Sequence, residues 1–413
     1  MKKLILLSVT ASAMIFGGGD IAPVEPAAPA SADFWGQIGF AYQFQDEDYK
    51  NPGDWGDEEN NAFSATVVLG VEKQLGYGFG FGAELAGWTD FGLDIADNAR
   101  VESSGDQTAA EVSQAYLTYS FGNTAVKAGR QALPKSLSPW AWTDRSAGVM
   151  DWSYDGIVIA NTDLSDTTLV GAWIAQIYHN SDEQYQVSDN AGLFMLGVVN
   201  KSLSDTTVSA AAYYVPESKY DINRAAGTSA KDTWSFWANA VTDIEGWKLG
   251  IQGAYVDGDY ASTDATYAIA GKVGSQWGDF DAELVASYIN DGDYSLRMAG
   301  TQLEDSALWS NNEEDADIVR NLTRNHSQGQ AGILLKAGYK LPVGKLYGTL
   351  GYWDFNNVDI AADRDNTFGA RVGYKFRIAD IDAKVEYRYR DREYKDNSHD
   401  KRQRIRVEAY YKF

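Results

Sequence analysis

The last thirteen residues of the chain, Lys401-Arg-Gln-Arg-Ile-Arg-Val-Glu-Ala-Tyr-Tyr-Lys-Phe413, alternate between apolar and polar side chains. Successive side chains of a β-strand point to opposite faces, so this pattern predicts a strand with one apolar and one charged face. The apolar face ends on Tyr411 and the terminal Phe413. A strand that is apolar toward lipid, charged toward an aqueous interior and aromatic at its end is typical of a membrane β-barrel.

The same two-residue period recurs along the chain, starting at 34–45. There are about eighteen such segments, or about sixteen in an alternative count, each near the ten residues that a tilted strand needs to cross a bilayer. Short turns such as Phe121-Gly-Asn-Thr124 alternate with long polar loops at 46–60, 90–110, 132–150, 178–189, 216–231, 257–264, 291–328, 355–365 and 391–400. The sequence therefore predicts an all-β transmembrane antiparallel barrel over 34–413, with short periplasmic turns and long extracellular loops.

The N-terminus predicts export. Lys2 and Lys3 precede the apolar run Leu4 to Phe16, and small residues follow it. This arrangement is typical of a secretory signal peptide, and the run is too short for a spanning helix. We assign 1–19 to the signal peptide, with cleavage between positions 13 and 32, and 20–33 to a flexible leader rich in Pro and Ala.

Composition excludes several classes of function. A net charge of −23 argues against a nucleic-acid partner, which requires a basic surface. The chain has no Cys, which excludes thiol catalysis, Cys-based metal sites and disulfides. Its three His fall in predicted loops, and neither Gly-x-Ser-x-Gly nor His-Glu-x-x-His occurs, so we do not expect an enzyme.

Basic residues share the charged face of the last three predicted strands. Parity along each strand places eight of them together: Arg371, Lys375, Arg377, Lys384, Arg388, Arg390, Arg404 and Arg406. An Arg facing mid-bilayer lipid costs about 2–4 kcal/mol, so these side chains should face the lumen. A basic wall there would attract anions, including carboxylates. The alternative is a structural network in which Glu386, Glu408 and acidic groups across the pore pair with these residues.

The third long loop, 132–150, has an unusual composition. Pro134 and Pro139 stiffen it, and tryptophan side chains are costly to leave in water. We expect it to fold into the barrel and narrow the pore, with five residues at the constriction: Lys135, Trp140, Trp142, Asp144 and Arg145. The alternative is an outer loop that packs on its neighbours or on another subunit.

Four acidic clusters occupy three of the long loops: Asp46-Glu-Asp48, Asp257-Gly-Asp259, Asp291-Gly-Asp293 and Glu313-Glu-Asp-Ala-Asp317. Ca²⁺ takes several carboxylate and carbonyl oxygens, but none of these clusters has the spacing of an EF-hand. A solvated acidic rim is the main interpretation. Divalent ions that bridge the rim to anionic outer-leaflet lipid, including lipopolysaccharide, are the alternative.

The segment Lys127-Ala-Gly-Arg-Gln131, followed by the Pro-containing loop and Asp155-Gly-Ile-Val-Ile159, resembles the OprD-like porins and the related major outer-membrane porins of epsilonproteobacteria. The strand Ser113-Gln-Ala-Tyr-Leu-Thr-Tyr119 and the leader Gly-Gly-Gly-Asp-Ile-Ala-Pro-Val-Glu-Pro are also similar. The resemblance implies about eighteen strands, a constricting third loop, a basic ladder in the lumen, and a homotrimer or bound Ca²⁺ in some members. The strong acidity of this chain departs from a simple anion channel.

The resemblance also implies passive uptake of small hydrophilic solutes and ions, with carboxylates favoured by the basic wall. We therefore expect an outer-membrane porin, delivered by barrel-assembly machinery that recognises Tyr411 and Phe413 at the C-terminus. A different class of function is a structural or adhesin barrel without significant conductance.

Overall fold

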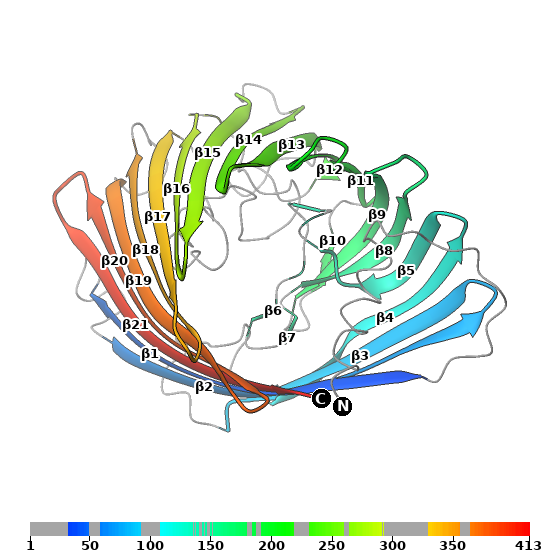
Figure 1. The fold of residues 1–413 in the computed structure, drawn as a ribbon, viewed down its shortest axis with the longest axis horizontal. Coiled ribbons are helices and arrows are strands. Elements are labelled where there is room, and N and C mark those ends of the chain that lie inside the picture. The colour runs from blue at the N-terminus through cyan, green and yellow to red at the C-terminus, as the bar shows by residue number, and fades with distance from the viewer. Residues whose placement is uncertain are drawn as a thin grey trace.

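The structure is a computed structural model. It describes residues 32–48, 58–91, 108–134, 136, 138–139, 143, 145–146, 149–150, 152–179, 184–186, 191–218, 231–259, 264–290, 292, 329–355 and 364–413. Its main sheet has nineteen strands; the short β10 is a side partner of β9, so eighteen strands form the wall. Each wall strand is antiparallel to the next and the last pairs with the first, which closes a barrel (Figure 1).

The wall strands are β1 (Asp33–Asp48), β2 (Glu58–Gly76), β3 (Phe79–Thr89), β4 (Ala109–Phe121), β5 (Thr124–Gln131), β8 (Trp152–Asn161), β9 (Thr167–His179), β11 (Leu193–Asn200), β12 (Thr206–Ser218), β13 (Lys231–Ile244), β14 (Trp247–Gly258), β15 (Thr266–Trp277), β16 (Phe280–Ile289), β17 (Gln330–Lys340), β18 (Lys345–Phe355), β19 (Arg364–Ile378), β20 (Ile381–Tyr394) and β21 (His399–Lys412). Three short strands lie inside the ring in Figure 1: β6 (Arg145–Ser146), β7 (Val149–Met150) and β10 (Gln184–Gln186).

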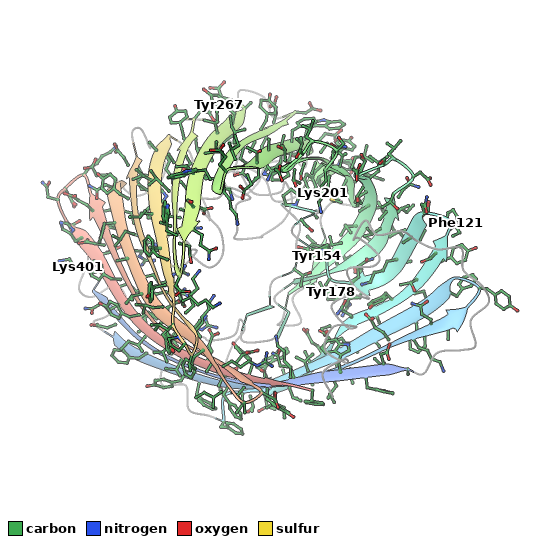
Figure 2. The ribbon with its side chains drawn as sticks, viewed as in Figure 1. Phe121, Tyr154, Tyr178, Lys201, Tyr267 and Lys401 are labelled. Atoms are coloured by element: carbon green, nitrogen blue, oxygen red, sulfur yellow. The ribbon has the colours of Figure 1, made fainter. Side chains whose placement is uncertain are left out.

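The outer face of the wall is apolar, as the two-residue period predicts. Side chains project to both sides of the wall (Figure 2), and large apolar residues such as Leu335, Val372 and Val407 are exposed on the outside. Trp247 and Trp277, with ring centroids 5.6 Å apart, lie near the short turns. Phe194, Tyr214 and Trp234 stack in a row near the long loops. An apolar band between two aromatic girdles is the outer surface of a membrane-spanning barrel.

The terminal strand closes the ring. β21 pairs with β1 from Gln37 opposite Lys412 to Asp48 opposite Lys401. The seam continues one residue further, because the Gly36 N–H donates to the Phe413 carbonyl at 2.9 Å and the Phe413 N–H donates back at 3.0 Å. The Phe413 ring lies over Gly36, where a Cβ would come within 2.4 Å of the ring. Recognition of Tyr411 and Phe413 by assembly machinery stays a prediction.

Two expectations about the strands are corrected. The count of sixteen is wrong. The expected long loop at 391–400 is a tight hairpin, because β20 runs to Tyr394 and β21 begins at His399. Polar side chains continue both strands beyond the apolar band, and Arg392 opposite Asp400 extends the pairing. The predicted signal peptide and most of the leader lie outside the described residues. None of the described residues forms a helix long and apolar enough to cross a membrane.

The seam depends on the absence of a side chain at Gly36. Gly36→Ala places a methyl group against the Phe413 ring, and overpacking of this kind costs about 1–3 kcal/mol. We expect the barrel to unfold at a lower temperature, measured by the mobility of the folded form in gel electrophoresis. Gly171→Ala is the control, because its Cβ meets nothing closer than the Leu196 side chain at 3.8 Å. Equal effects of the two changes would contradict a role for this contact.

Candidate functional site

Three arginines lie side by side on the inner face, halfway along the last three strands. Arg371 on β19 is opposite Arg388 on β20, which is opposite Arg404 on β21. Their neighbours along the strands, Val372 and Ile405 among them, are exposed on the outer face. The arginines therefore point into the barrel. We call Arg371, Arg388 and Arg404 the arginine row.

A second level of basic residues lies next to the arginine row, toward the long loops. Arg390 is opposite Arg402, and Arg392 follows opposite Asp400. Arg390 and Arg392 are buried, at 3% and 5% exposed. Sequence reasoning missed Arg392 and Arg402, although both share the parity of the arginines it selected on their strands.

Two carboxylates form ion pairs with residues of the basic wall, on the side of the short turns. Glu386, 2% exposed, accepts from Arg388 and lies 3.8 Å from the Arg371 Nε. Glu408 accepts from Lys384 at 3.0 Å and from Arg406. The expected pairing with these two glutamates is therefore present at this level.

A tyrosine reaches Glu386 across a neighbouring strand. Tyr347 on β18, Gly373 on β19 and Glu386 on β20 lie in one register row. The Tyr347 hydroxyl donates to Glu386 at 2.5 Å, and a Cβ on Gly373 would lie 2.4 Å from the tyrosine ring. Only glycine in the middle strand leaves room for the ring to cross.

The same crossing occurs on the other side of the barrel. Tyr116 on β4 passes over Gly82 on β3 and donates to Glu72 on β2 at 2.5 Å. The Lys127 ammonium lies 3.6 Å from the centroid of the Tyr116 ring. Sequence reasoning missed both crossings, because each joins three strands whose register it did not assign.

Basic residues also line strands that precede β19. Lys272 on β15 and Lys336 on β17 flank Glu283 at 3.5 and 3.9 Å. Lys336 is opposite Thr349, which is opposite Arg371, so Lys336 continues the arginine row around the wall. Glu283 is opposite Lys336 in the same register row, and Lys272 lies one level toward the long loops. Lys345 pairs with Asp281 at 2.7 Å closer to the short turns.

Two of the predicted wall residues on β19 lie further toward the short turns than the arginine row. Lys375 and Arg377 are exposed near the short-turn end of β19. Lys375 lies 5.0 Å from the Tyr347 ring centroid, and the Arg377 Nε lies 3.5 Å from Asp382. They face the mouth of the barrel, whereas the row lies at half its height.

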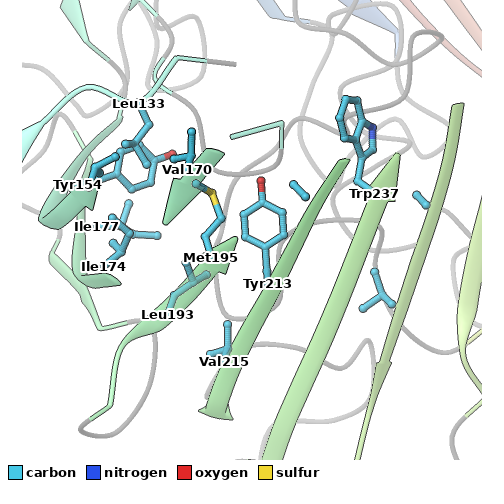
Figure 3. Close-up of a cluster of buried hydrophobic side chains, with 14 of the residues drawn as sticks. Leu133, Tyr154, Val170, Ile174, Ile177, Leu193, Met195, Tyr213, Val215 and Trp237 are labelled. Carbon is cyan, nitrogen blue, oxygen red and sulfur yellow. The ribbon is translucent and has the colours of Figure 1, made fainter. Parts of the chain in front are cut away.

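The inner face on the opposite side is apolar. Buried side chains of β8, β9 and β11–β13 form a cluster there, shown in Figure 3: Tyr154, Val170, Ile174, Ile177, Leu193, Met195, Tyr213, Val215 and Trp237. Leu133, from the third long loop, packs into this cluster. Ser138 of the same loop lies 3.3 Å from the Tyr213 hydroxyl, and β7 contacts β2 and β3. The described parts of the third loop thus lie inside the barrel.

The predicted constriction residues are not placed. Lys135, Trp140, Trp142 and Asp144 lie outside the described residues, and of Arg145 the structure describes only the backbone, which pairs with Met150. Their place at a constriction stays a prediction.

The acidic loop clusters are placed only in part. The structure describes no group of three or more His, Asp or Glu side chains that could hold a metal ion, among the residues it covers. Most of the clusters at 291–293 and 313–317 lie outside those residues. Calcium binding stays a prediction.

No protein-family model and no curated protein matches the sequence. Solved structures do match, each over 92% of this chain. Pseudomonas aeruginosa OpdO matches with a TM-score of 0.67 at 14% identity and 97% of its own length. Pseudomonas aeruginosa OccK8 (OprE) matches with a TM-score of 0.68 at 12% identity and 98% of its own length. The outer membrane protein opdK, from the same organism, matches with a TM-score of 0.68 at 10% identity and 99% of its own length. The chain has an OprD-like barrel fold. The resemblance to the OprD-like porins, which the sequence indicated over about residues 110–160, is confirmed at the level of the fold.

The Tyr347 crossing should stabilise the wall beneath the arginine row. Tyr347→Phe removes a hydrogen bond to a buried carboxylate, which is worth about 1.5–3 kcal/mol. We expect a lower midpoint of urea-induced unfolding in lipid vesicles. Tyr339→Phe, on the outer face of the adjacent β17, is the matched control and should change the midpoint little. A midpoint unchanged by Tyr347→Phe would show that the crossing contributes nothing to stability.

Proposed function

We propose that this protein is an outer-membrane porin through which small hydrophilic solutes and ions diffuse passively, with carboxylates favoured by the basic wall. The observation that carries the proposal is the arginine row at half height on the inner face. The apolar outer band and the likeness of the barrel to outer-membrane proteins support the location.

The charges around the arginine row support anion preference. Within β19–β21, five arginines lie at two successive levels, that of the arginine row and that of Arg390 and Arg402. No carboxylate of these three strands lies at either level. Carboxylates flank these two levels: Glu386 lies one level toward the short turns, and Asp400 lies one level toward the long loops. Charges on adjacent strands are about 5 Å apart, so their potentials add at the wall.

The overall acidity of the chain does not oppose this preference. Exposed charges are screened over about 8–10 Å at physiological salt. A solute at half height therefore experiences mainly the side chains of the surrounding wall, where the arginines are concentrated. Acidic loops then influence entry at the extracellular mouth more than passage through the barrel.

The third loop is proposed to set the size limit. Leu133 is 3% exposed within the apolar inner wall, and Ser138 contacts Tyr213 on the same side. Leu133 and Ser138 thereby lie on the side of the lumen away from the basic wall, and β7 of the same loop contacts β2 and β3. Solutes then pass between the loop and the arginines. A homotrimer and contacts with lipopolysaccharide remain predictions.

The role of the arginine row is tested by removing two of its charges. In planar bilayers we expect stepwise conductance and an anion-selective reversal potential. Arg388→Gln with Arg404→Gln should lower the anion-to-cation permeability ratio by about threefold or more, because two charges leave the lumen wall. The control is Lys201→Gln with Lys395→Gln, an equal loss of charge in exposed turns.

A wild-type protein without stepwise conductance would reject the porin and favour the structural or adhesin barrel. If the arginine variant conducts with an unchanged permeability ratio, the protein is a porin whose selectivity does not depend on the arginine row.

The role of the third loop is tested at its apolar anchor. Leu133→Asp introduces a carboxylate into the apolar inner wall, and the cost of burying that charge should displace the loop. We expect a larger single-channel conductance and faster uptake of larger solutes into liposomes. Leu164→Asp, in an exposed short turn, is the control and should change neither. A conductance unaffected by Leu133→Asp would argue against a loop that limits the pore.

A further inference from the structure

Four arginines on β20 and β21 form a square on the inner face. Its members face each other across the two strands at two successive levels: Arg388 opposite Arg404, and Arg390 opposite Arg402. We call these four residues the arginine square. Adjacent strands are about 4.7–4.9 Å apart and alternate residues of a strand about 7 Å apart, so the square is compact.

The square encloses a small cavity. Its lining consists of the four arginines and Tyr389, and its volume is about 10 Å³. A space of this size holds one water-sized group, such as a single oxygen atom. Arg390 and Arg404 are only 3% and 6% exposed, so the guanidinium groups crowd together at the wall.

Neighbouring residues orient two corners of the square. Glu386 accepts from Arg388 on the side of the short turns, and Gln45 on β1 accepts from the Arg404 Nε at 3.0 Å. Like charges directly opposite each other on adjacent strands are destabilising. An anion bound between the guanidinium groups of the two strands would relieve that repulsion at both levels.

We propose that the arginine square is a binding site for a tetrahedral dianion, a phosphoryl or sulfate group. Guanidinium groups present a planar fork of donors that matches the oxygens of such a group. A carboxylate has two oxygens in one plane, so it can bind one guanidinium group through both oxygens or bridge one pair of arginines. A tetrahedral dianion has oxygens that diverge in three dimensions, so it can place one in the cavity and direct others to arginines of both strands and both levels.

This inference rests on the proposed porin for the access of solutes to the lumen. It goes beyond a general preference for carboxylates, because it assigns one location and one charge class. The anion is either inorganic or the end of an organic solute, since the cavity accepts only one oxygen and leaves the rest of the ligand in the lumen.

The experiment measures block of chloride current by added anions in planar bilayers. Sodium sulfate and glycerol phosphate are the probes, and sodium acetate at equal ionic strength is the reference. We expect sulfate to reduce the current saturably at concentrations where acetate has no effect. Glycerol phosphate blocks equally if the site accepts a substituted phosphoryl group, whereas sulfate alone blocks if it takes only inorganic ions. Equal action of acetate and sulfate would overturn the site.

Substitutions locate the block. Arg390→Gln with Arg402→Gln should raise the half-blocking sulfate concentration about tenfold or more, since each charge-assisted hydrogen bond contributes strongly. Lys272→Gln with Lys336→Gln removes equal charge elsewhere on the inner wall and should change it less than about threefold. If both double variants raised the half-blocking sulfate concentration equally, the block would depend on the total charge of the inner wall and not on the arginine square.

A second variant keeps the charge of the wall and so controls for misfolding caused by the loss of charge. Arg390→Lys with Arg402→Lys retains the charge and loses the forks, so chloride preference should persist while sulfate block weakens. Unchanged block in this variant would contradict recognition by guanidinium groups. Calorimetric titration of the solubilised protein with sulfate separates this site from the porin itself. Binding without conductance would reject only the porin, and an anion-selective channel without sulfate binding would reject only the site.

Discussion

The structure depends on one constraint: a backbone that crosses hydrocarbon must satisfy every N–H and C=O within itself. Eighteen antiparallel strands meet it only if the last pairs with the first, and β21 does so with β1 from Lys401 to Lys412. The seam ends on the reciprocal hydrogen bonds of Gly36 and Phe413. Once the ring is closed, each residue belongs to one face, and charged side chains of the apolar band are confined to the inside.

Closure also determines which inward residues meet. Toward the short turns, acidic and basic residues alternate across β20 and β21, with Lys384 opposite Glu408 and Glu386 opposite Arg406. At half height and at the next level toward the long loops, arginine is opposite arginine. The structural network and the concentrated positive charge are therefore features of one wall at different heights. The paired level anchors the wall, and the level above it carries the excess of charge.

The lumen has two unlike sides. The inner face of β8, β9 and β11–β13 is apolar and buried, with Leu133 of the third loop packed into it. The inner face of β15–β21 carries Lys272, Lys336 and the arginine row. Apolar contact thus holds Leu133 to the side opposite the basic wall, whereas β7 of the same loop contacts β2 and β3. Tyr116 on β4 and Tyr347 on β18 each cross a glycine to reach a carboxylate, so β2–β4 and β18–β20 are joined in the same way.

The sequence by itself determined the barrel, the face of each strand and the inward direction of residues such as Arg371 and Arg404, because a period of two is a local property of the backbone. It also suggested a rigid third loop from two prolines and two tryptophans. It mistook 391–400 for a long loop, because polar residues that extend a strand beyond the membrane resemble loop residues. Only the tertiary structure decided the arginine square, the tyrosine crossings and the contribution of Lys272 and Lys336. Those depend on register between strands far apart in sequence, and parity specifies a face without specifying a neighbour.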